Sequence, residues 1–182
     1  MIIRQATEED ISDIKRISDA LQVSRDQPGW QTRTSGIFEY QITEQELYTA
    51  LNPWFYVAET SSGIKGYSLA CDSNFFRERY ENTNHLELKN ILSQTGDFLY
   101  WDQLGVLNPD SLGAGRIVNE LADKTLRIAK SGTLEKAFAY VCEKPLHNQR
   151  SANFLKRKGF RKIQEVPIEN QVVLAMYELS LK

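Results

Sequence analysis

Residues 98–130 constrain the fold of this chain more than any other segment. They contain an apolar run, FLYWDQLGV, then a short turn with Gly113 and Gly115, and then a long amphipathic stretch. The run predicts a strand over residues 98–106, and the later stretch has apolar residues at helical spacing. A strand that leads through a glycine turn into a helix can hold a phosphate, because the first amides of a helix have no partner within it. Such turns also occur for purely structural reasons, and both interpretations stay open here.

The rest of the chain alternates predicted strands with predicted helices. Strands are expected at residues 1–5, 54–59, 64–71, 137–142, 160–166 and 172–181, and helices at 7–22, 43–51, 74–93 and 148–158. Thr7 and Thr43 begin the first two helices as capping residues, with Asp10 and Glu46 three positions later. Residues 23–40 have no clear period, and they either cover the core or face a substrate. Because two hairpins interrupt the alternation, we expect an α+β fold with a mixed sheet of six to seven strands and helices on both faces.

Length, charge and cysteine content narrow the class of protein. A chain of 182 residues suits a single domain over residues 1–182. Its 22 basic and 24 acidic residues give a net charge of −2, which argues against a general nucleic-acid binder. No apolar run approaches the length of a membrane span and no secretory signal is visible, so we expect a soluble cytoplasmic protein. Cys71 and Cys142 lie in apolar runs and are expected to be buried reduced thiols, and we predict no metal site.

Three short motifs in the second half of the chain fit together. Residues 106–115, VLNPDSLGAG, form the turn before the long helix; Asn148 and Ser151 begin the next helix, and residues 158–160, KGF, end it. In this order they resemble the GNAT superfamily of acyl-CoA-dependent N-acyltransferases. The cofactor turn of that family is written Q/R-x-x-G-x-G/A, and its following helix ends in Gly-Phe. The resemblance covers nearly the whole chain.

The resemblance implies acetyl-CoA as a co-substrate. Its pyrophosphate would lie against the N–H groups of residues 112–116, and its pantetheine arm or adenosine phosphates against Asn148, which also reads as a plain helix cap. The predicted cofactor-binding residues are Leu104, Val106, Leu112, Gly113, Ala114, Gly115, Arg116, Asn148 and Ser151. The basic residues between Lys144 and Lys162 either serve the 3′-phosphate of the cofactor or form a solvated helix end.

The resemblance also directs attention to proton transfer. Amide formation from a thioester needs a neutral amine, so a side chain must accept a proton from the ammonium form. Asp102 is the first candidate, because it precedes the cofactor turn on the same strand face as Leu104 and Val106. Desolvation would raise its pKa; alternatively, it caps a loop or pairs with an arginine. Glu143, at the end of the next strand, is the second candidate. By the resemblance, a backbone N–H of residues 104–106 would stabilise the oxyanion.

Two residues depart from the family pattern. Asp110 stands where the turn motif has Gln or Arg, and Leu155 stands where many members have a tyrosine that reprotonates the departing thiolate. The first hypothesis is therefore an N-acetyltransferase that acts on a primary amine, and the second is a CoA-binding module without transferase activity. A nucleoside-triphosphate enzyme comes third, because no Gly-Lys-Ser/Thr follows the turn. The expected partners are acetyl-CoA and an amine-bearing acceptor, with no nucleic acid and no membrane, and we also consider a homodimer.

Overall fold

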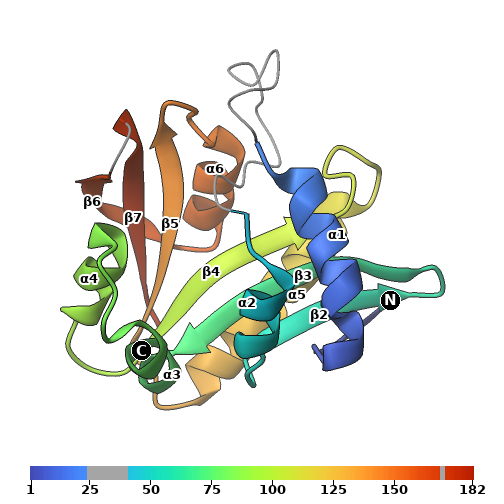
Figure 1. Cartoon of the computed structure of the whole chain (residues 1–182), viewed down its shortest axis with the longest axis horizontal. Coiled ribbons are helices and arrows are strands. Elements are labelled where there is room, and N and C mark those ends of the chain that lie inside the picture. Colours follow the sequence, from blue (N-terminus) through green and yellow to red (C-terminus); the bar gives the residue numbers. More distant parts are fainter. Residues whose placement is uncertain (24–40, 169–170) are drawn as a thin grey trace. The chain divides into compact units, whose positions relative to one another are not determined.

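The structure, a computed structural model, describes residues 1–23, 41–168 and 171–182 (Figure 1). Within this part of the chain, seven strands form a mixed sheet in the order β1-β2-β3-β4-β5-β7-β6. The strands are β1 (Ile2–Gln5), β2 (Phe55–Thr60), β3 (Gly63–Asp72), β4 (Phe98–Val106), β5 (Lys136–Lys144), β6 (Arg161–Pro167) and β7 (Val173–Ser180). The helices of the described residues are η1 (Glu8–Asp10), α1 (Ile11–Leu21), α2 (Glu44–Thr49), α3 (Ser73–Tyr80), α4 (Leu86–Leu92), α5 (Ala114–Ser131) and α6 (Gln149–Arg157). The predicted mixed α+β sheet is confirmed.

The strand pairing explains why the sheet is mixed. β4 and β5 pair in parallel, from Phe98 opposite Lys136 to Trp101 opposite Ala139. The pairs β1–β2, β2–β3, β5–β7 and β6–β7 are antiparallel. A parallel pair requires a long crossover between its strands, and α5 lies in that crossover. Both predicted hairpins, β2–β3 and β6–β7, are confirmed.

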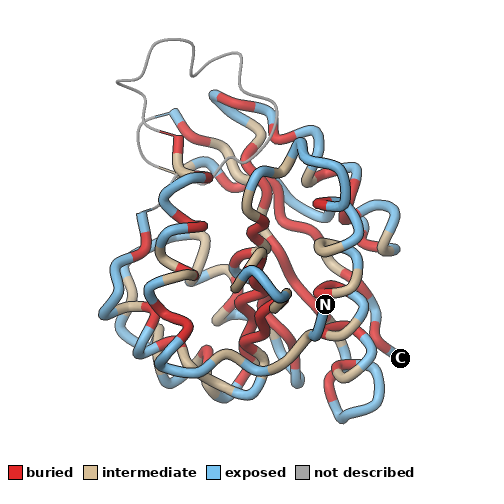
Figure 2. Tube along the Cα trace, turned by 90° about the vertical axis from the view of Figure 1, so that its right-hand side faces the viewer, coloured by how far each residue is buried: buried red, intermediate tan, exposed pale blue. Residues whose placement is uncertain are grey.

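The chain divides into two compact units, residues 1–70 with 103–128 and residues 71–102 with 129–182. Buried residues, drawn red in Figure 2, concentrate in the sequence along β2, β3, β4, β5 and β7. The single domain over residues 1–182 stays a prediction.

In the first unit, helices cover both faces of the β2–β3 hairpin. Phe55 and Val57 join a buried cluster with α1 and α2, whereas Tyr56 and Ala58 pack with Leu121 of α5. Successive residues of a strand point to opposite faces of its sheet. The two clusters therefore lie on opposite faces, and the prediction of helices on both faces is confirmed in this unit.

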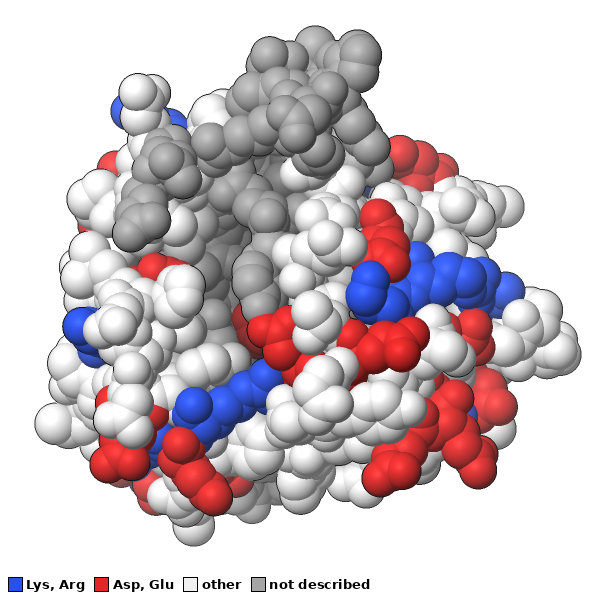
Figure 3. All heavy atoms as spheres, viewed as in Figure 1, with Lys and Arg blue, Asp and Glu red and all other residues white. Residues whose placement is uncertain are grey.

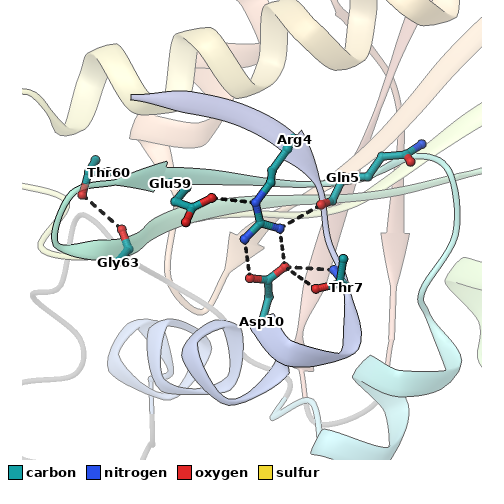
Figure 4. Close-up of polar contacts among 7 residues, drawn as sticks. All are labelled: Arg4, Gln5, Thr7, Asp10, Glu59, Thr60 and Gly63. Carbon is teal, nitrogen blue, oxygen red and sulfur yellow. Dashed lines mark hydrogen bonds and ion pairs between the residues drawn. The ribbon is translucent and has the colours of Figure 1, made fainter.

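A polar cluster ties the first strand of this unit to its first helix and to β2 (Figure 4). Arg4 donates from its two terminal nitrogens to the carboxylate oxygens of Asp10, over 2.6 and 2.7 Å, and from Nε to Glu59 over 2.6 Å. Asp10 also accepts from the backbone N–H and the hydroxyl of Thr7, so the predicted capping pair is confirmed. Burial acts to raise the pKa of Asp10, but the hydrogen bonds from Arg4 and Thr7 hold it below its ordinary value.

Two glycines allow β3 and β4 to approach closely within the first unit. A Cβ on Gly66 would lie 2.8 Å from the carbonyl oxygen of Gly105 and 3.0 Å from Cγ2 of Ile117. A Cβ on Gly105 would lie 2.7 Å from Cε1 of Tyr67. Because real Cβ atoms do not approach other atoms this closely, only glycine fits at either position.

In the second unit an aromatic cluster joins α3 and α4 to the strands. The ring of Phe76 lies 5.7 Å from that of Phe98 and 4.8 Å from that of Tyr100, measured between centroids, with both contacts edge-on. Phe98 contacts Phe138 of β5 at 5.7 Å in the same way, and Ile91 of α4 is buried in this cluster. The region before β4 was predicted to be largely helical, and the structure resolves it into the two short helices α3 and α4.

The structure also bears on the predictions for the cysteines, membrane spans and surface charge. The two cysteines are free and buried, as expected, and burial raises the pKa of the Cys71 thiol. Across the described residues, no helix has the length and apolar character needed to cross a bilayer. Basic and acidic side chains are interspersed on the face drawn in Figure 3, in line with the small net charge. Of the loop predicted at residues 23–40, all but Val23 lies outside the described residues.

Candidate cofactor and catalytic site

In the first unit, the turn between β4 and α5 ends at a glycine in a conformation that other residues rarely adopt. Gly113 has a φ of +96°. Two of the five amides predicted to hold phosphate, those of residues 112–116, are used inside the turn itself. The N–H of Ala114 donates to the carbonyl of Ser111 over 3.2 Å, and the N–H of Arg116 donates to the carbonyl of Gly113 over 3.0 Å.

The other three amides of this turn face no protein acceptor. Among the described residues, the N–H groups of Leu112, Gly113 and Gly115 donate to no other group. A Cβ at Gly113 or Gly115 would have no neighbour within 4 Å, and the Leu112 side chain is fully exposed. These amides lie at the positive end of the dipole of α5, a helix of 18 residues. The turn therefore offers three donors to an anion, and at the two glycines no side chain covers them.

Leu104 and Val106 lead into this turn on β4, and their side chains face the protein. Leu104 is half-buried and packs against the cluster of Tyr56 and Leu121, and Val106 is buried. A cofactor contact at either residue would therefore be made by its backbone N–H or carbonyl group. This agrees with the predicted role of a backbone N–H from residues 104–106, which stays a prediction.

Arg116 points along α5. Its Nε donates to Oε1 of Glu120 over 2.7 Å, and its side chain is 78% exposed. Arg116 is one of the predicted cofactor-binding residues, where its charge would lie beside the phosphates. The structure pairs it with Glu120, so a phosphate would have to compete with this carboxylate for the guanidinium group.

In the second unit, Asp102 is exposed although its neighbours Tyr100 and Trp101 in β4 are buried. The sequence argument for Asp102 as a base relied on desolvation of its carboxylate, and an exposed side chain does not meet that condition. Burial raises the pKa of Tyr100, and the negative charge of Asp102 raises it further. An exposed carboxylate is accessible to an ammonium group, and the catalytic role of Asp102 stays a prediction.

Glu143, the second predicted base, has a partner at each of its carboxylate oxygens. Oε2 lies 2.6 Å from Nδ1 of His147, and Oε1 accepts a hydrogen bond from Nζ of Lys162 over 3.1 Å. Only 14% of the Glu143 side chain is exposed. Lys162 donates in addition to Glu165 over 2.7 Å, so the carboxylate of Glu143 is part of a network from β5, the following turn and β6.

Asn148 and Ser151 form the start of α6. Oδ1 of Asn148 accepts from the backbone N–H of Ser151 over 3.1 Å, which confirms the interpretation of Asn148 as a helix cap. Asn148 is buried and Ser151 is half-buried. Their contact with a cofactor stays a prediction. Leu155 is buried on the same helix, so this position supplies no proton donor.

The basic residues after β5 differ in their surroundings. Arg150, Lys156, Arg157 and Arg161 are exposed. The ammonium group of Lys158 lies over the ring of Phe154, 5.6 Å from its centroid, and Lys162 pairs with two carboxylates. The role of these residues at the 3′-phosphate, and the alternative of a solvated helix end, stay predictions.

Sequence reasoning missed one candidate in this unit, His147. Glu143 and His147 are four positions apart on either side of Pro145. A carboxylate and an imidazole at this spacing across a turn are a signal for a side-chain pair. The signal is weak, because the pair forms only if the turn folds back on the strand end.

Comparisons with known proteins address the fold. No protein-family model and no curated protein matches the chain. Among solved structures, Arabidopsis thaliana Naa50 in complex with the bisubstrate analogue CoA-Ac-MVNAL is similar with a TM-score of 0.66 and 14% identity, over 98% of this chain and 97% of that one. An N-acetyltransferase from Staphylococcus aureus Mu50 gives a TM-score of 0.63 and 17% identity, over 100% of this chain and 98% of that one.

A third structure extends this comparison. A ribosomal-protein-alanine N-acetyltransferase from Brucella melitensis gives a TM-score of 0.64 and 14% identity, over 99% of each chain. At such identities the similarity establishes the fold. The chain therefore has the fold of the GNAT N-acetyltransferases, as the sequence resemblance predicted.

Proposed function

We propose that this protein is an N-acetyltransferase that transfers an acetyl group from acetyl-CoA to a primary amine by direct attack. The GNAT fold supports the reaction class, and the turn before α5 supports the cofactor. The carrying observation is the geometry of that turn, where the amides of Leu112, Gly113 and Gly115 are available beside two glycines that border open space. An anion with several oxygens, such as a pyrophosphate, can accept hydrogen bonds from several N–H donors.

The remaining cofactor contacts belong to the same proposal. Backbone groups of Leu104 and Val106 would bind the pantetheine arm and stabilise the oxyanion that forms at the thioester carbon. Asn148 and Ser151 would contact the cofactor from the start of α6. Arg116 would contribute charge after release from Glu120.

The reaction requires two proton movements. An acceptor amine is protonated at neutral pH, so it must lose one proton before its nitrogen attacks the thioester carbon. The tetrahedral adduct then loses its second proton as the C–S bond breaks. The sequence proposes Asp102 and Glu143 for the first proton, and an Asp102→Asn variant with unchanged kcat/KM at every pH would remove Asp102 from that role.

The first experiment measures cofactor binding by the melting temperature with and without acetyl-CoA. A ligand at about 100 times its dissociation constant adds about 2.7 kcal/mol to the free energy of unfolding. For a chain of this length, that corresponds to a rise of roughly 5–10 °C in melting temperature. Adenosine triphosphate is the control ligand, because the chain has no Gly-Lys-Ser/Thr after the turn. No shift with acetyl-CoA at millimolar concentration would contradict the proposal.

The second experiment measures turnover by release of the CoA thiol against a panel of amines. The panel contains small alkyl amines, lysine side chains in peptides, and peptides with free N-termini. Naa50 has been crystallised with an analogue that joins CoA to a peptide, and this motivates the peptide members of the panel. Cytoplasmic location and a homodimer stay predictions.

A CoA-binding module without transferase activity is the second candidate function. The observation that favours it is the buried leucine at position 155, where many family members place a tyrosine. This candidate predicts a melting-temperature shift with acetyl-CoA but no thiol release with any amine. The two experiments together therefore separate the two functions.

A further inference from the structure

One buried tyrosine of the second unit has a hydroxyl group without a partner among the described residues. Tyr100 of β4 is only 5% exposed, and its ring packs edge-on against Phe76 with 4.8 Å between the centroids. Its hydroxyl makes no hydrogen bond within the part of the chain that the structure describes. In that part, Nε1 of Trp101 is the one fully buried side-chain nitrogen or oxygen without a partner, so the Tyr100 hydroxyl reaches solvent. Because a buried tyrosine hydroxyl usually has a hydrogen-bond partner, this one is available to a ligand.

A second tyrosine of the same cluster has a partnered hydroxyl. Tyr140 of β5 packs against the cluster that contains Phe76 and Tyr100. Its hydroxyl donates to the backbone carbonyl of Glu87 in α4 over 2.9 Å, which ties the strand to the helix. The two tyrosines therefore share an environment and differ in whether the hydroxyl is used within the protein. Tyr140 serves as the matched control for Tyr100.

A carboxylate lies close to Tyr100. Asp102 follows two positions later on β4, and residues two apart on a strand share one face. The charge of Asp102 raises the pKa of Tyr100 and that of the Cys71 thiol on β3, in addition to the larger effect of burial. At Cys71 the charge of Asp102 has a larger effect than that of Arg79, which lowers the pKa. The surroundings of Tyr100 are therefore negative overall, and Asp102 is exposed to solvent.

The chemistry of these groups restricts the class of ligand. A carboxylate repels anions, and covering it with an apolar molecule would cost free energy. Within the described residues, no group of three or more histidine, cysteine, aspartate or glutamate side chains could hold a metal ion. A carboxylate and a phenol oxygen both accept hydrogen bonds from N–H groups. An organic ammonium group supplies both the positive charge and the N–H donors, so it is the ligand that fits this pair.

We propose that the carboxylate of Asp102 and the hydroxyl of Tyr100 bind the ammonium group of the acceptor amine. This inference rests on the proposed acetyl transfer, and it concerns binding and assigns no proton transfer to either residue. The position on β4 supports it, because Asp102 lies about 7 Å along the strand from Leu104, whose backbone is a proposed oxyanion contact. The preferred acceptor is an amine that is charged at pH 7, such as an alkyl or lysine side-chain amine.

The test measures binding to the full-length protein by NMR titration at pH 7. The probe is n-butylamine, and 1-butanol is its uncharged analogue of similar shape. We expect the amine to bind at least about tenfold more tightly than the alcohol, because a hydrogen bond to a charged group is stronger than a neutral one. Equal affinity for the two probes would overturn the inference.

Three variants assign the binding to particular atoms. Asp102→Asn should raise the dissociation constant of n-butylamine about tenfold or more, and Tyr100→Phe about two- to tenfold. Tyr140→Phe should keep the wild-type affinity, because its hydroxyl is already bonded within the protein. In the thiol-release assay, Tyr100→Phe should raise KM for n-butylamine and keep kcat. Wild-type affinity in Tyr100→Phe, or equal losses in Tyr100→Phe and Tyr140→Phe, would contradict the assignment.

Melting temperatures provide a measurement that needs no ligand. Tyr100→Phe should melt at the wild-type temperature, since no hydrogen bond of the described residues is lost. Tyr140→Phe loses the bond to Glu87 and should melt about 2–4 °C lower. An equal fall in both variants would mean that the Tyr100 hydroxyl is used within the protein, and the inference would fail.

Failure of the proposed function and failure of this inference give different results. If acetyl-CoA raises the melting temperature and amines release thiol, but n-butylamine binds equally well to Asp102→Asn and Tyr100→Phe, the inference alone fails. If n-butylamine binds as expected but acetyl-CoA gives no shift, acetyl transfer fails and the ammonium site is supported.

Discussion

Replacing Gly113 or Gly115 of the turn before α5 with alanine should affect stability and cofactor binding differently, and Gly115→Ala is the more informative change. Gly115 is within α5, has no positive φ, and a Cβ there would have no neighbour within 4 Å. Alanine should therefore stabilise the free protein by about 0.5–1 kcal/mol, because glycine in a helix costs conformational entropy. The melting temperature should rise by about 1–4 °C.

The same methyl group should weaken acetyl-CoA binding. It would occupy the open space beside the Gly115 amide, where the proposed pyrophosphate lies. A hydrogen bond to a charged group contributes about 1.5–3 kcal/mol. Loss of one such bond therefore raises the dissociation constant roughly 10- to 100-fold. Isothermal titration with acetyl-CoA measures this change, and unchanged affinity in a stabilised Gly115→Ala variant would refute the assignment of the turn.

Two neighbouring substitutions distinguish backbone strain in the turn from loss of acetyl-CoA binding. Gly113→Ala places a side chain at a φ of +96°, so we expect a loss of about 1–2 kcal/mol in stability although the methyl group meets no atom. Leu112→Ala truncates a fully exposed side chain in the same turn. Because only the amide of Leu112 is proposed to contact the cofactor, this variant should change stability by less than about 0.5 kcal/mol and leave the affinity unchanged.

Two further substitutions test the packing of the first unit. Asp10→Asn should cost about 2 kcal/mol at neutral pH, because it removes a buried carboxylate that accepts from Arg4; Asp13→Asn, which touches only an exposed ion pair, should cost less than about 1 kcal/mol. The folded pKa of Asp10 lies below 3.8, so its contribution is present above that pH and is lost as pH falls through the folded pKa. A difference between these variants that persists in urea melts at acid pH would contradict this account. Gly66→Ala should destabilise the protein by about 1–3 kcal/mol, since the Cβ would lie 2.8 Å from a backbone oxygen, and an unchanged melting temperature would show that β3 and β4 can separate there.

The parts of the fold that sequence could predict depend on neighbours in the chain. The capping pair of Thr43 and Glu46, with hydrogen bonds of 2.8 and 3.2 Å, involves residues three positions apart. The glycine turn before α5 and the two hairpins are likewise local. A short stretch of sequence contains all the residues of such a feature. The contacts among them therefore form wherever the segment lies in the fold.

The parts that sequence could not predict depend on strand order. The sequence predicts that β6 and β7 form a hairpin. It does not predict that β7, the later strand, lies next to β5. That order decides which side chains of the hairpin approach Glu143, and hence that Lys162 reaches it. The same limit applies to Gly66 and Gly105, whose glycines are explained only when β3 and β4 are placed side by side.

The charged residues of the candidate site show a related limit. Arg116 was assigned to phosphate because it follows the turn, but Glu120 stands one helical turn later and takes its guanidinium group. Sequence gives both residues and the spacing that joins them. It does not give the relative strength of an ion pair on the helix and a ligand that arrives from outside.

The free-energy costs of the two proton transfers show whether the proton acceptor for the amine or the proton donor for the thiolate matters more to the rate. A lysine-like amine has a pKa of about 10.4, about 3.4 units above pH 7. The free energy needed to deprotonate it at that pH is therefore roughly 5 kcal/mol. A thiol with a pKa of about 8.5 lies only about 1.5 units away, so departure as a thiolate costs roughly 2 kcal/mol. The buried Leu155 therefore removes the less important group, whereas the acceptor of the first proton is decisive.

The need for a proton acceptor depends on the pKa of the substrate amine. An α-amino group with a pKa of about 7.7–8 is only about one unit from neutrality and needs little help to lose its proton. If Asp102 accepts that proton, Asp102→Asn should therefore slow the acetylation of alkyl and lysine side-chain amines far more than that of peptide N-termini. Equal losses for both classes would mean that Asp102 acts on structure or on cofactor binding. Thiol release with paired acceptors measures the ratio of the two losses directly.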